Sequence, residues 1–449
     1  MIEARSVVTS PEATIAQEIL AMALRNSRDA ELFWASEESF TAGTTDTRPP
    51  RAVRREGEGV ALRVISAGRV GFAVHVGSLA TVDSSALLKE ATRRSAEGPE
   101  APPTFWKDRE IGPAEAIWDE NVAALGAGDV TRLVRQASLR LEDALGPVPR
   151  DVAVRRVVRQ VALISRTAER RFEKTIFQFR AQVGPLGRSD AVLSDTWASC
   201  RLPDDPMHCL ADILWRAPFS RDAARTEPGL IDAVLSPRAT GTLLRWACGG
   251  LTGRAFIDGS SPLLGCLGKR VFDERLTLAD DPSQPWAANA APYDGEGVPR
   301  HRHALIERGV LQGLLLDLSS AHKLEMSPSG SAVRAMDSAP AAAPSHLDLA
   351  PGEGSLDDML AAGENGVYVD SFPEDLEPSP NGDFTAPLRA AYPIRGGRPS
   401  GWLSGMALVG NVYDLLADHL SAVGGDRATG VGWRCGPIAL RDVELIRCP

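Results

Sequence analysis

The sequence lacks the features that mark secreted, membrane-spanning or nucleic-acid-binding proteins. Only six of the 449 residues are cysteine, and they form neither a CxxC pair nor a dense framework, so we expect reduced thiols. No apolar run approaches the length of a membrane span. The opening stretch MIEARSVVTS has an early acid and no apolar leader core. These absences predict a cytoplasmic protein without a membrane partner.

Positive charge is also in short supply. The formal net charge is -10 and the sequence pI is about 5.4, a balance that repels a phosphate backbone. We therefore expect no nucleic-acid partner. The hydrophobic share of 43% and the charged share of 24% are typical of globular proteins, and the length favours two or three domains.

The first unit is predicted over residues 1–97. Pro11 suits the first turn of a helix, Asp83 can cap a second helix, and Ala67-Gly68 suggests a tight hairpin. Strands are predicted at 31–36, 60–66 and 69–76. The proline-rich stretch that follows predicts a linker at 98–118.

A central unit is predicted over residues 119–230. Apolar residues keep helical spacing from Asp129 until Gly146 ends the helix. The predicted strands lie at 152–158, 161–166 and 173–183, with a short helix at 208–216. Basic residues alternate along these strands, but no paired aromatic platform accompanies them. A solvated sheet face is therefore favoured over an RNA-binding face.

The third unit, residues 231–449, is predicted to be a larger mixed β domain with packed helices. One helix is expected after Ser355, ending at Gly363, and another at 405–423. The stretch 338–351 is rich in proline, alanine and serine and is expected to be extended and irregular. The predicted fold class is thus α+β, with a small N-terminal α/β unit, a central α+β unit and this C-terminal domain.

The segment 236–253, SPRATGTLLRWACGGLTG, predicts the best-marked helix of the third unit. Ser236 can cap it, and Pro237 suits its first position. Leucine and alanine recur at helical spacing through Leu251, and Gly249-Gly250 loosens the far end. By itself the segment is an ordinary amphipathic helix.

Two acidic runs invite a metal or acid/base interpretation. FDERLTLADDP at 272–282 and YDGEGVP at 293–299 cluster carboxylates, which hard cations prefer. Aspartate beside proline and glycine is also common turn chemistry, and we favour turns. His301 and His303 have a spacing that can ligate zinc, but the neighbouring arginines favour a solvated strand edge.

Nucleophilic motifs are weak. There is no GxSxG, and the serines, cysteines and histidines form no recognisable triad pattern. Gly265–Lys269 resembles part of a phosphate loop, but Arg270 stands where a magnesium-binding Ser or Thr belongs. Cys435 lies in a glycine-rich turn and could be a reactive thiol, although a lone cysteine is more often inert packing. No catalytic residue is therefore assigned.

Several strings, taken in order, resemble the TldD/PmbA family. They are SPRATGTLLRWACGGLTGRA, GSSPLLGCLGKRVFDERLTLADDP, DGEGVPRHRHALIERGVLQGLLLDLSSAHKL, LAPGEGSLDDMLAAGENGVYVDSF and GMALVGNVYDLLADHLSAVGGD. The resemblance is densest in the last half of the chain. The family has two kinds of subunit, which pair as a heterodimer that degrades or trims unfolded peptides.

The resemblance also implies where a metal would sit. TldD-type subunits carry an HExxxH motif plus a distant cysteine. Here Leu244, Arg245 and Gly249 stand where His, Glu and His would be, and HExxxH occurs nowhere else. This pattern resembles the PmbA (TldE) type, the subunit without its own metal. It implies no cofactor in this chain, and zinc or a similar divalent metal in a TldD-like partner.

Three hypotheses follow. The first is a metal-free subunit of a TldD/TldE-like complex acting on unfolded or precursor peptides. The second is a regulatory binding protein of the gyrase-modulator type. The third is a stand-alone peptidase that uses Cys435 or the carboxylates of 273–296, and it ranks last because no nucleophile and base are paired.

Overall fold

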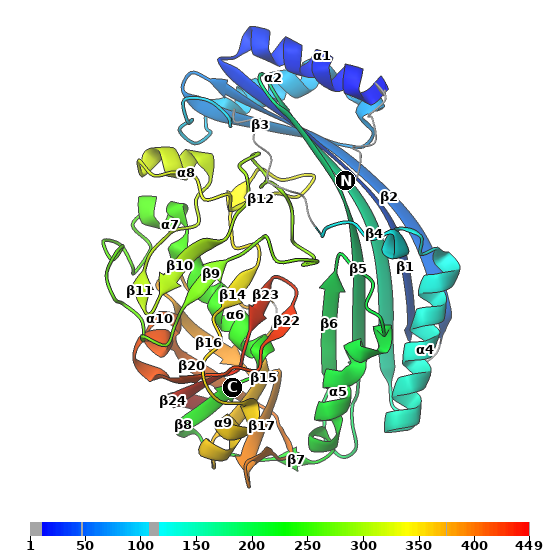
Figure 1. The fold of residues 1–449 in the computed structure, drawn as a ribbon, viewed down its shortest axis with the longest axis vertical. Helices are drawn as coiled ribbons and strands as arrows, with labels where there is room; N and C mark the ends of the chain where they lie inside the picture. Colours follow the sequence, from blue (N-terminus) through cyan, green and yellow to red (C-terminus); the bar gives the residue numbers. More distant parts are fainter. Residues whose placement is uncertain (1–10, 46–47, 107–115, 374, 449) are drawn as a thin grey trace.

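The computed structural model describes residues 11–45, 48–106, 116–373 and 375–448. A long curved sheet runs from the top of the molecule to its lower right, and a mixed β domain lies beside its lower half (Figure 1). The predicted α+β class is confirmed. Within the described residues, no helix is both long enough and apolar enough to cross a membrane.

The curved sheet is antiparallel, with strand order β3-β2-β1-β4-β5-β6. Its strands are β1 (Asp29–Thr45), β2 (Arg48–Ser66), β3 (Arg69–Val76), β4 (Arg150–Ser165), β5 (Glu169–Val183) and β6 (Leu193–Ser199). Because β1 pairs with β4 along nearly its whole length, strands from the predicted first and central units form one sheet. The predicted division between residues 97 and 119 therefore falls inside a continuous sheet. Residues 107–115, in the middle of the predicted linker at 98–118, lie outside the described residues.

Helices cover the sheet at its two ends. Near the top, α1 (Pro11–Asn26) and α2 (Ser84–Ser95) bury Ile19 and Leu88 against β1, β2 and β3 (Figure 1). At the lower right, α4 (Ala127–Leu145) buries the stripe that includes Val134 and Leu141. The predicted start of α1, the Asp83 cap of α2 and the Gly146 end of α4 are confirmed.

The first two strands are far longer than the apolar pattern predicted. The outer half of β1 carries Glu37 and Glu38, which pair with arginines from both neighbouring strands: Arg155 and Arg159 on β4 for Glu37, and Arg54 on β2 for Glu38. Arg156 of β4 also reaches Glu38. Cross-strand ion pairs of this kind stabilise strands that have little apolar surface to bury.

The C-terminal domain contains two larger sheets. One has the order β16-β20-β24-β8-β15-β17-β18, with β21 also paired to β24, and the other β11-β10-β9-β14-β23-β22. The first comprises β8 (Gly229–Leu235), β15 (Val367–Ser371), β16 (Asp383–Pro387), β17 (Ala390–Arg395), β18 (Arg398–Pro399), β20 (Met406–Asn411), β21 (Leu420–Val423) and β24 (Ile438–Arg447). The second comprises β9 (Leu278–Asp280), β10 (His303–Glu307), β11 (Val310–Leu311), β14 (Leu347–Leu349), β22 (Ala428–Gly430) and β23 (Trp433–Cys435).

Helix α6 (Pro237–Ala247) lies between these two sheets and is central to the domain core. Short strand pairs complete the domain: β12 (Ala332–Val333) with β13 (Ala341–Ala342), and β7 (Ala223–Ala224) with β19 (Trp402–Leu403). The other helices are α3 (Glu120–Ala123), α5 (Ala211–Arg216), α7 (Gly253–Ile257), α8 (Leu318–Lys323), α9 (Leu356–Ala362) and α10 (Val412–Asp414). The predicted helix between Ser355 and Gly363 is confirmed by α9.

One helix prediction was wrong. Residues 405–423 form β20, a short helical turn from Val412 to His419, and β21. Met406–Val409 pairs with β24 on one side, and β20 pairs with β16 on the other, so both edges of this apolar strand are paired. A buried strand and a helix stripe are both rich in leucine and valine, and tertiary pairing decided between them.

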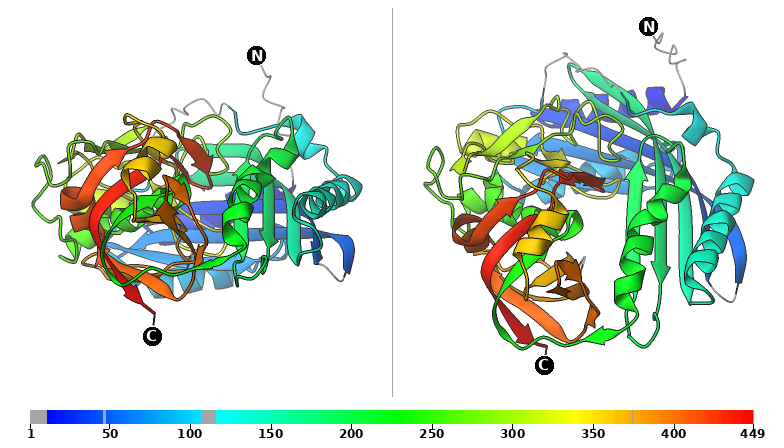
Figure 2. Two further views of the ribbon diagram at one scale, coloured as in Figure 1. Left: turned by 90° about the horizontal axis from the view of Figure 1, so that it is seen from below. Right: turned by 60° about the horizontal axis from the view of Figure 1, so that its bottom comes forward.

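The two parts of the molecule approach each other at β6. This strand is one edge of the curved sheet, and with α5 it stands nearest to the C-terminal domain (Figures 1 and 2). Across the gap, β22 is the edge strand of the second C-terminal sheet and contacts β6. Cavities between these elements define the candidate site.

Candidate functional site

Helix α6 begins where β8 ends, and its start is fixed by Ser236. The Ser236 hydroxyl accepts a hydrogen bond from the Ala239 amide at 3.1 Å and donates one to the Asp370 carbonyl at 2.7 Å. Ser236 therefore caps the N-terminus of the helix and also ties it to β15. Pro237 occupies the first turn, as predicted.

The buried face of α6 anchors the domain. Trp246 packs against Phe372 and Phe384, with ring centroids 5.1 Å and 5.2 Å away, and its indole nitrogen donates to the Leu376 carbonyl at 2.9 Å. Leu244 is fully buried in the same core. Removing a large side chain from such a position costs about 2–5 kcal/mol, so this face is under strong packing constraint.

Close backbone approaches fix the position of the helix. A Cβ on Gly241 would lie 2.7 Å from the Trp433 ring, and one on Gly250 would lie 2.2 Å from the Tyr413 hydroxyl. The same hydroxyl donates to the Ala247 carbonyl at 3.3 Å. Burial raises the pKa of Tyr413 to about 12, so it remains a neutral donor near neutral pH.

The three positions singled out by the family resemblance do not share one face. Leu244 points into the core, whereas Arg245 and Gly249 are exposed and line one cavity of about 390 Å³. Arg245 also lines a second cavity, of about 490 Å³, together with Arg238 and Thr242. The open face of α6 thus presents guanidinium, hydroxyl and glycine, with no imidazole, carboxylate or thiolate.

Cys435 lies beside the start of α6 and is fully buried. Its thiol donates to the Pro237 carbonyl at 2.9 Å, and burial raises its pKa above the ordinary range. A neutral, buried thiol is a poor nucleophile. The packing interpretation of Cys435 therefore agrees with its environment.

A cluster of charged side chains surrounds the N-terminal end of α6. Arg238 pairs with Asp195 of β6 at 2.9 Å, with Asp370 of β15 at 3.2 Å and, more closely, with Asp212 of α5. Arg216 of α5 pairs with Asp370 at 2.6 Å and Asp212 at 3.2 Å. Four elements from both parts of the molecule are joined by these five residues, which we call the α6 ion cluster.

Burial and partner charge compete within the α6 ion cluster. Burial raises the pKa of Asp195 and of Asp370, although Arg238 opposes the rise at both carboxyls. Burial acts in the same direction on Asp212, but Arg216 and Arg238 outweigh it and lower that pKa. The guanidinium of Arg238 has a raised pKa because its attraction to three aspartates outweighs its burial. The cluster was not predicted, because its members are separated by up to 175 positions in the sequence.

The cluster forms part of the wall of two adjoining cavities, of about 490 Å³ and about 560 Å³. Asp195, Thr196, Arg238 and Trp433 line both. The larger one is also lined by the edge strand β22 and by Trp215 of α5. Together they form a cleft between β6 and the open face of α6, which we call the α6 cleft.

The edge of β6 that faces this cleft is partly occupied. The Ser194 carbonyl accepts hydrogen bonds from Arg216 at 3.1 Å and from Arg238 at 3.2 Å. The opposite edge strand, β22, is exposed at Ala428 and Thr429. The backbone of β22 is therefore the more open of the two strand edges.

The acidic runs mostly serve as turns, as favoured from sequence. Asp281 accepts from the backbone and side chains of Ser283 and Gln284, and Asp294 accepts from the amides of Glu296 and Val298. Glu296, however, is buried in an ion pair with Arg63 of β2. That contact joins the two parts of the molecule across 233 residues of sequence, which a local pattern could not indicate.

The two histidines lie at the start of β10, and His303 is half-buried and pairs with Asp280 of β9, so the predicted solvated strand edge applies to His301 alone. His301 is exposed, and a ring nitrogen of His303 lies 3.0 Å from the Leu314 carbonyl. Among the residues that the structure describes, no three His, Cys, Asp or Glu side chains are grouped so as to hold a metal ion. The arrangement around α6 is suited to binding an extended chain, with backbone acceptors and donors on β22 and cations on α6.

The sequence of the C-terminal half is similar to those of known metallopeptidases. Residues 228–447 match the model of the PmbA/TldA metallopeptidase C-terminal domain. A "Metalloprotease" of Methanothermobacter thermautotrophicus is 32% identical over 209 residues, which are 46% of this chain and 45% of that protein. "Metalloprotease PmbA" of Escherichia coli O157:H7 is 26% identical over 198 residues, covering 44% and 41%. The matches thus span less than half the length of these relatives.

Solved structures resemble the whole chain. TldE from Thermococcus kodakarensis superposes with a TM-score of 0.82 at 17% identity, covering 96% of this chain and 99% of that one. A putative modulator of DNA gyrase from Bacteroides thetaiotaomicron gives 0.80 at 21% identity, covering 98% and 100%. The fold is that of TldE and its structural relatives. The predicted resemblance is confirmed for residues 228–447, which form a C-terminal domain of the PmbA/TldA metallopeptidase type.

Proposed function

We propose that this chain is the metal-free subunit of a two-chain metallopeptidase, paired with a TldD-like subunit and acting on unfolded or precursor peptides. One observation carries the proposal. The face of α6 that lines the cleft presents Arg238, Thr242 and Arg245, and none of these is a preferred ligand for zinc. The exposed guanidinium of Arg245 on that face also repels a divalent cation.

The peptide is proposed to lie in the α6 cleft along the exposed edge of β22. Main-chain hydrogen bonds to an edge strand give affinity without reading side chains, which suits unfolded substrates. Arg245 and Arg389 line the cleft and are exposed, so they are available to carbonyl or carboxylate groups of the peptide. In this role the chain shapes and orients the substrate, while a divalent metal in the partner supplies the hydrolytic chemistry.

The stand-alone peptidase hypothesis is weakened by the surroundings of Cys435. Its thiol is buried, it is already donating to a carbonyl, and its pKa is raised. Glu296 and Asp294, two buried carboxylates of the acidic runs, are engaged with Arg63 and with backbone amides. These contacts support a structural role for both groups.

The central test uses metal content and peptide hydrolysis. The purified chain alone is expected to hold far less than one metal per chain by elemental analysis and to leave an unfolded peptide intact. Co-expression with a TldD-like chain carrying HExxxH should give a complex that cleaves the peptide and is inhibited by chelators. One tightly held metal per isolated chain, lost in Cys435→Ser, would overturn the assignment.

A second test examines substrate positioning. Arg245→Ala should reduce peptide cleavage by the complex while leaving its assembly and metal content unchanged, because the side chain is exposed and makes no hydrogen bond or ion pair with the described residues. Arg135→Ala, on the exposed side of α4, is the matched control. Equal cleavage by both variants would remove Arg245 from the substrate site.

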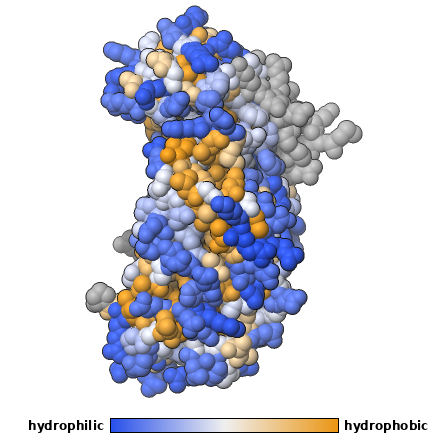
Figure 3. Space-filling model, turned by 90° about the vertical axis from the view of Figure 1, so that its left-hand side faces the viewer, coloured by the Kyte–Doolittle hydropathy of each residue, from blue (hydrophilic) through white to orange (hydrophobic). Residues whose placement is uncertain are grey.

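A third test addresses the partner surface. Apolar side chains gather on the face shown in Figure 3, and Leu264 and Leu267, between α7 and β9, are exposed by 56% and 42%. Exposed leucines in one short segment favour a protein contact. Leu264→Glu with Leu267→Glu should weaken co-purification of the TldD-like chain. Leu139→Glu, at a 54% exposed leucine of α4, should not.

A further inference from the structure

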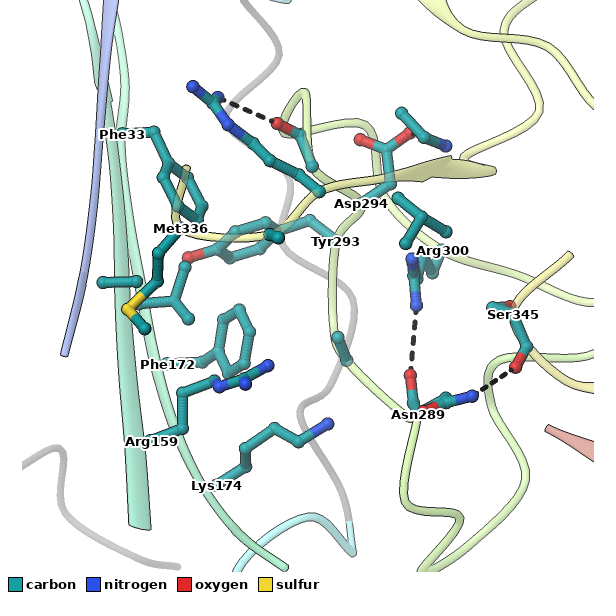
Figure 4. A pocket seen from close by; sticks show the side chains of 18 of the residues that line it. Phe33, Arg159, Phe172, Lys174, Asn289, Tyr293, Asp294, Arg300, Met336 and Ser345 are labelled. Carbon is teal, nitrogen blue, oxygen red and sulfur yellow. Dashed lines mark hydrogen bonds between the residues drawn. The ribbon is translucent and has the colours of Figure 1, made fainter. Parts of the chain in front are cut away.

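A separate cavity of about 210 Å³ lies between the curved sheet and the loops of the C-terminal domain (Figure 4). Strands β1, β4 and β5 form one wall, and the segments around 289–300 and 332–345 form the other. It shares Asn289, Pro344 and Ser345 with the lining of the α6 cleft but otherwise has different residues. We call it the Lys174 cavity.

Lys174 is buried in this cavity and only 5% exposed, and no Asp or Glu among the described residues forms an ion pair with it. The ammonium donates to the Ala288 carbonyl at 2.6 Å and the Ala290 carbonyl at 3.0 Å. An ammonium has three N–H groups, so a third remains for another acceptor. A buried charge that lacks a counter-ion is costly and calls for compensation.

Two more polar groups of the cavity are incompletely satisfied. The Arg300 side chain donates to the Asn289 carbonyl at 3.1 Å, but its buried Nε has no acceptor among the described residues. The hydroxyl of Tyr293, a residue 3% exposed, likewise has none there. Native proteins rarely leave several buried polar atoms of one cavity unpaired. These groups therefore point to a ligand that the cavity is built to hold.

The acidic groups nearby are committed elsewhere. Arg159 also lines the cavity, but Glu37 pairs with it. Asp294 is held by three backbone amides, those of Glu296, Val298 and Ala332. Figure 4 shows Asp294 at the far end of the cavity from Lys174. Asp294 and Asp280 interact electrostatically with Arg300, whereas Lys174 pairs with no carboxylate among the described residues. The uncompensated positive charge of the cavity therefore lies at Lys174.

The rest of the lining is mostly apolar, apart from Arg334, which lies over the Phe33 ring and pairs with Glu31. Phe172 and Tyr293 meet edge to face with centroids 5.1 Å apart, and Phe33, Val161 and Met336 surround them. In Figure 4 Phe33, Met336 and Phe172 lie on the sheet side, and Tyr293 extends toward them from the opposite loop. Lys174 and Asn289 lie below, and Arg300 lies to the right. Charge at one end and aromatic surface at the other define an amphiphilic site.

We propose that the Lys174 cavity binds a carboxylate that carries a short branched apolar group. The carboxylate would accept from Lys174 and Arg300, and the apolar group would pack against Phe172 and Tyr293. Two sources offer this chemistry: a free small acid, or the C-terminal carboxylate of a peptide ending in an apolar residue. The proposal concerns this chain alone and does not depend on the proposed metallopeptidase partnership.

The experiment measures binding to the purified full chain by calorimetry. Isovalerate represents the free acid, and acetyl-Ala-Ala-Leu with a free terminus represents the peptide. Isovaleramide and the peptide amide, each lacking the charge, are the matched controls. At least one carboxylate is expected to bind with a Kd of about 1 mM or tighter, and its amide at least tenfold more weakly. Whichever carboxylate binds identifies the source.

Lys174→Met is expected to abolish this binding, and Arg300→Gln to weaken it about tenfold. Lys89→Met, at an exposed lysine of α2, is the control for a general loss of positive charge. Thermal unfolding establishes whether each variant is folded. If Lys174→Met does not fold, the Arg300→Gln variant alone provides the test. Failure of both carboxylates to bind, equal binding of acid and amide, or wild-type affinity in both cavity variants would overturn the proposal.

Discussion

Two groups of buried charges lie where the curved sheet meets the C-terminal domain, and they are compensated differently. In the α6 ion cluster every guanidinium faces at least two carboxylates. In the Lys174 cavity the ammonium has only carbonyl partners among the described residues. The first arrangement is complete within the protein and serves structure. In the second, the proposed bound carboxylate supplies the missing counter-charge, as expected of a binding site.

The largest expected effect comes from breaking the complete cluster. Arg216→Met would leave Asp370 buried with one weaker partner, Arg238, and should destabilise the protein by about 3–5 kcal/mol in chemical denaturation. Arg188→Met removes an exposed pair with Asp222 and should cost less than about 1 kcal/mol. Similar losses in both variants would show that the cluster adds nothing beyond a surface pair.

A smaller effect of opposite sign is expected at Lys174. Burial lowers its pKa from 10.5 to about 8, with further lowering by Arg159 and Arg300. Below pH 8 the side chain is charged in both states, and the folded state bears the full penalty. Between about pH 8 and 10.5 the folded state loses the proton first, so stability rises with pH through this window.

Lys174→Met should therefore be as stable as the wild type or more stable at pH 7, by on the order of 1–3 kcal/mol. The difference should shrink as the pH rises from 8 to 10, and denaturation at several pH values measures it. Lys89→Met, which alters an exposed lysine, should show no such trend. A constant difference across this range would mean that Lys174 is compensated in the folded protein.

The smallest expected effect is at Asp195. Asp195→Asn removes one of three carboxylates around Arg238, while Asp212 and Asp370 still pair with it. The cost should be about 1 kcal/mol, well below that of Arg216→Met. A loss as large as that of Arg216→Met would indicate that the cluster depends on all its members equally.

Local signals in the sequence predicted elements whose ends are set by local chemistry. Asp83, Gly146, Ser236 and Gly363 mark helix ends by capping or by backbone freedom, and the structure confirms each. The outer half of β1 and the charged part of β2 were missed, because arginines on neighbouring strands stabilise them. Residues 405–423 were misassigned for a related reason: pairing with β16 and β24 is invisible in an apolar pattern.

The candidate site was predicted only in part. The α6 segment was correctly predicted to be a helix, but the sequence resemblance could not show that Leu244 faces the core while Arg245 and Gly249 are exposed and line a cavity. The α6 ion cluster and the Lys174 cavity bring together residues from the sheet and from distant loops. No spacing rule links Asp195 to Asp370, or Lys174 to Arg300, so only the tertiary structure reveals them.

The pairing of β1 with β4 has a consequence for synthesis. Glu31 faces Ser165 in the finished sheet, more than a hundred residues later in the chain. During translation the β1–β2 hairpin therefore emerges with one long edge unpaired for about 10 s or more, at ordinary elongation rates. The acidic pair Glu37 and Glu38 lies on that waiting edge. Glu38 can pair with Arg54 within the hairpin, but the partners of Glu37 are Arg155 and Arg159 of β4. We therefore expect the charge of Glu37 to disfavour edge-to-edge joining of nascent chains until β4 has been made.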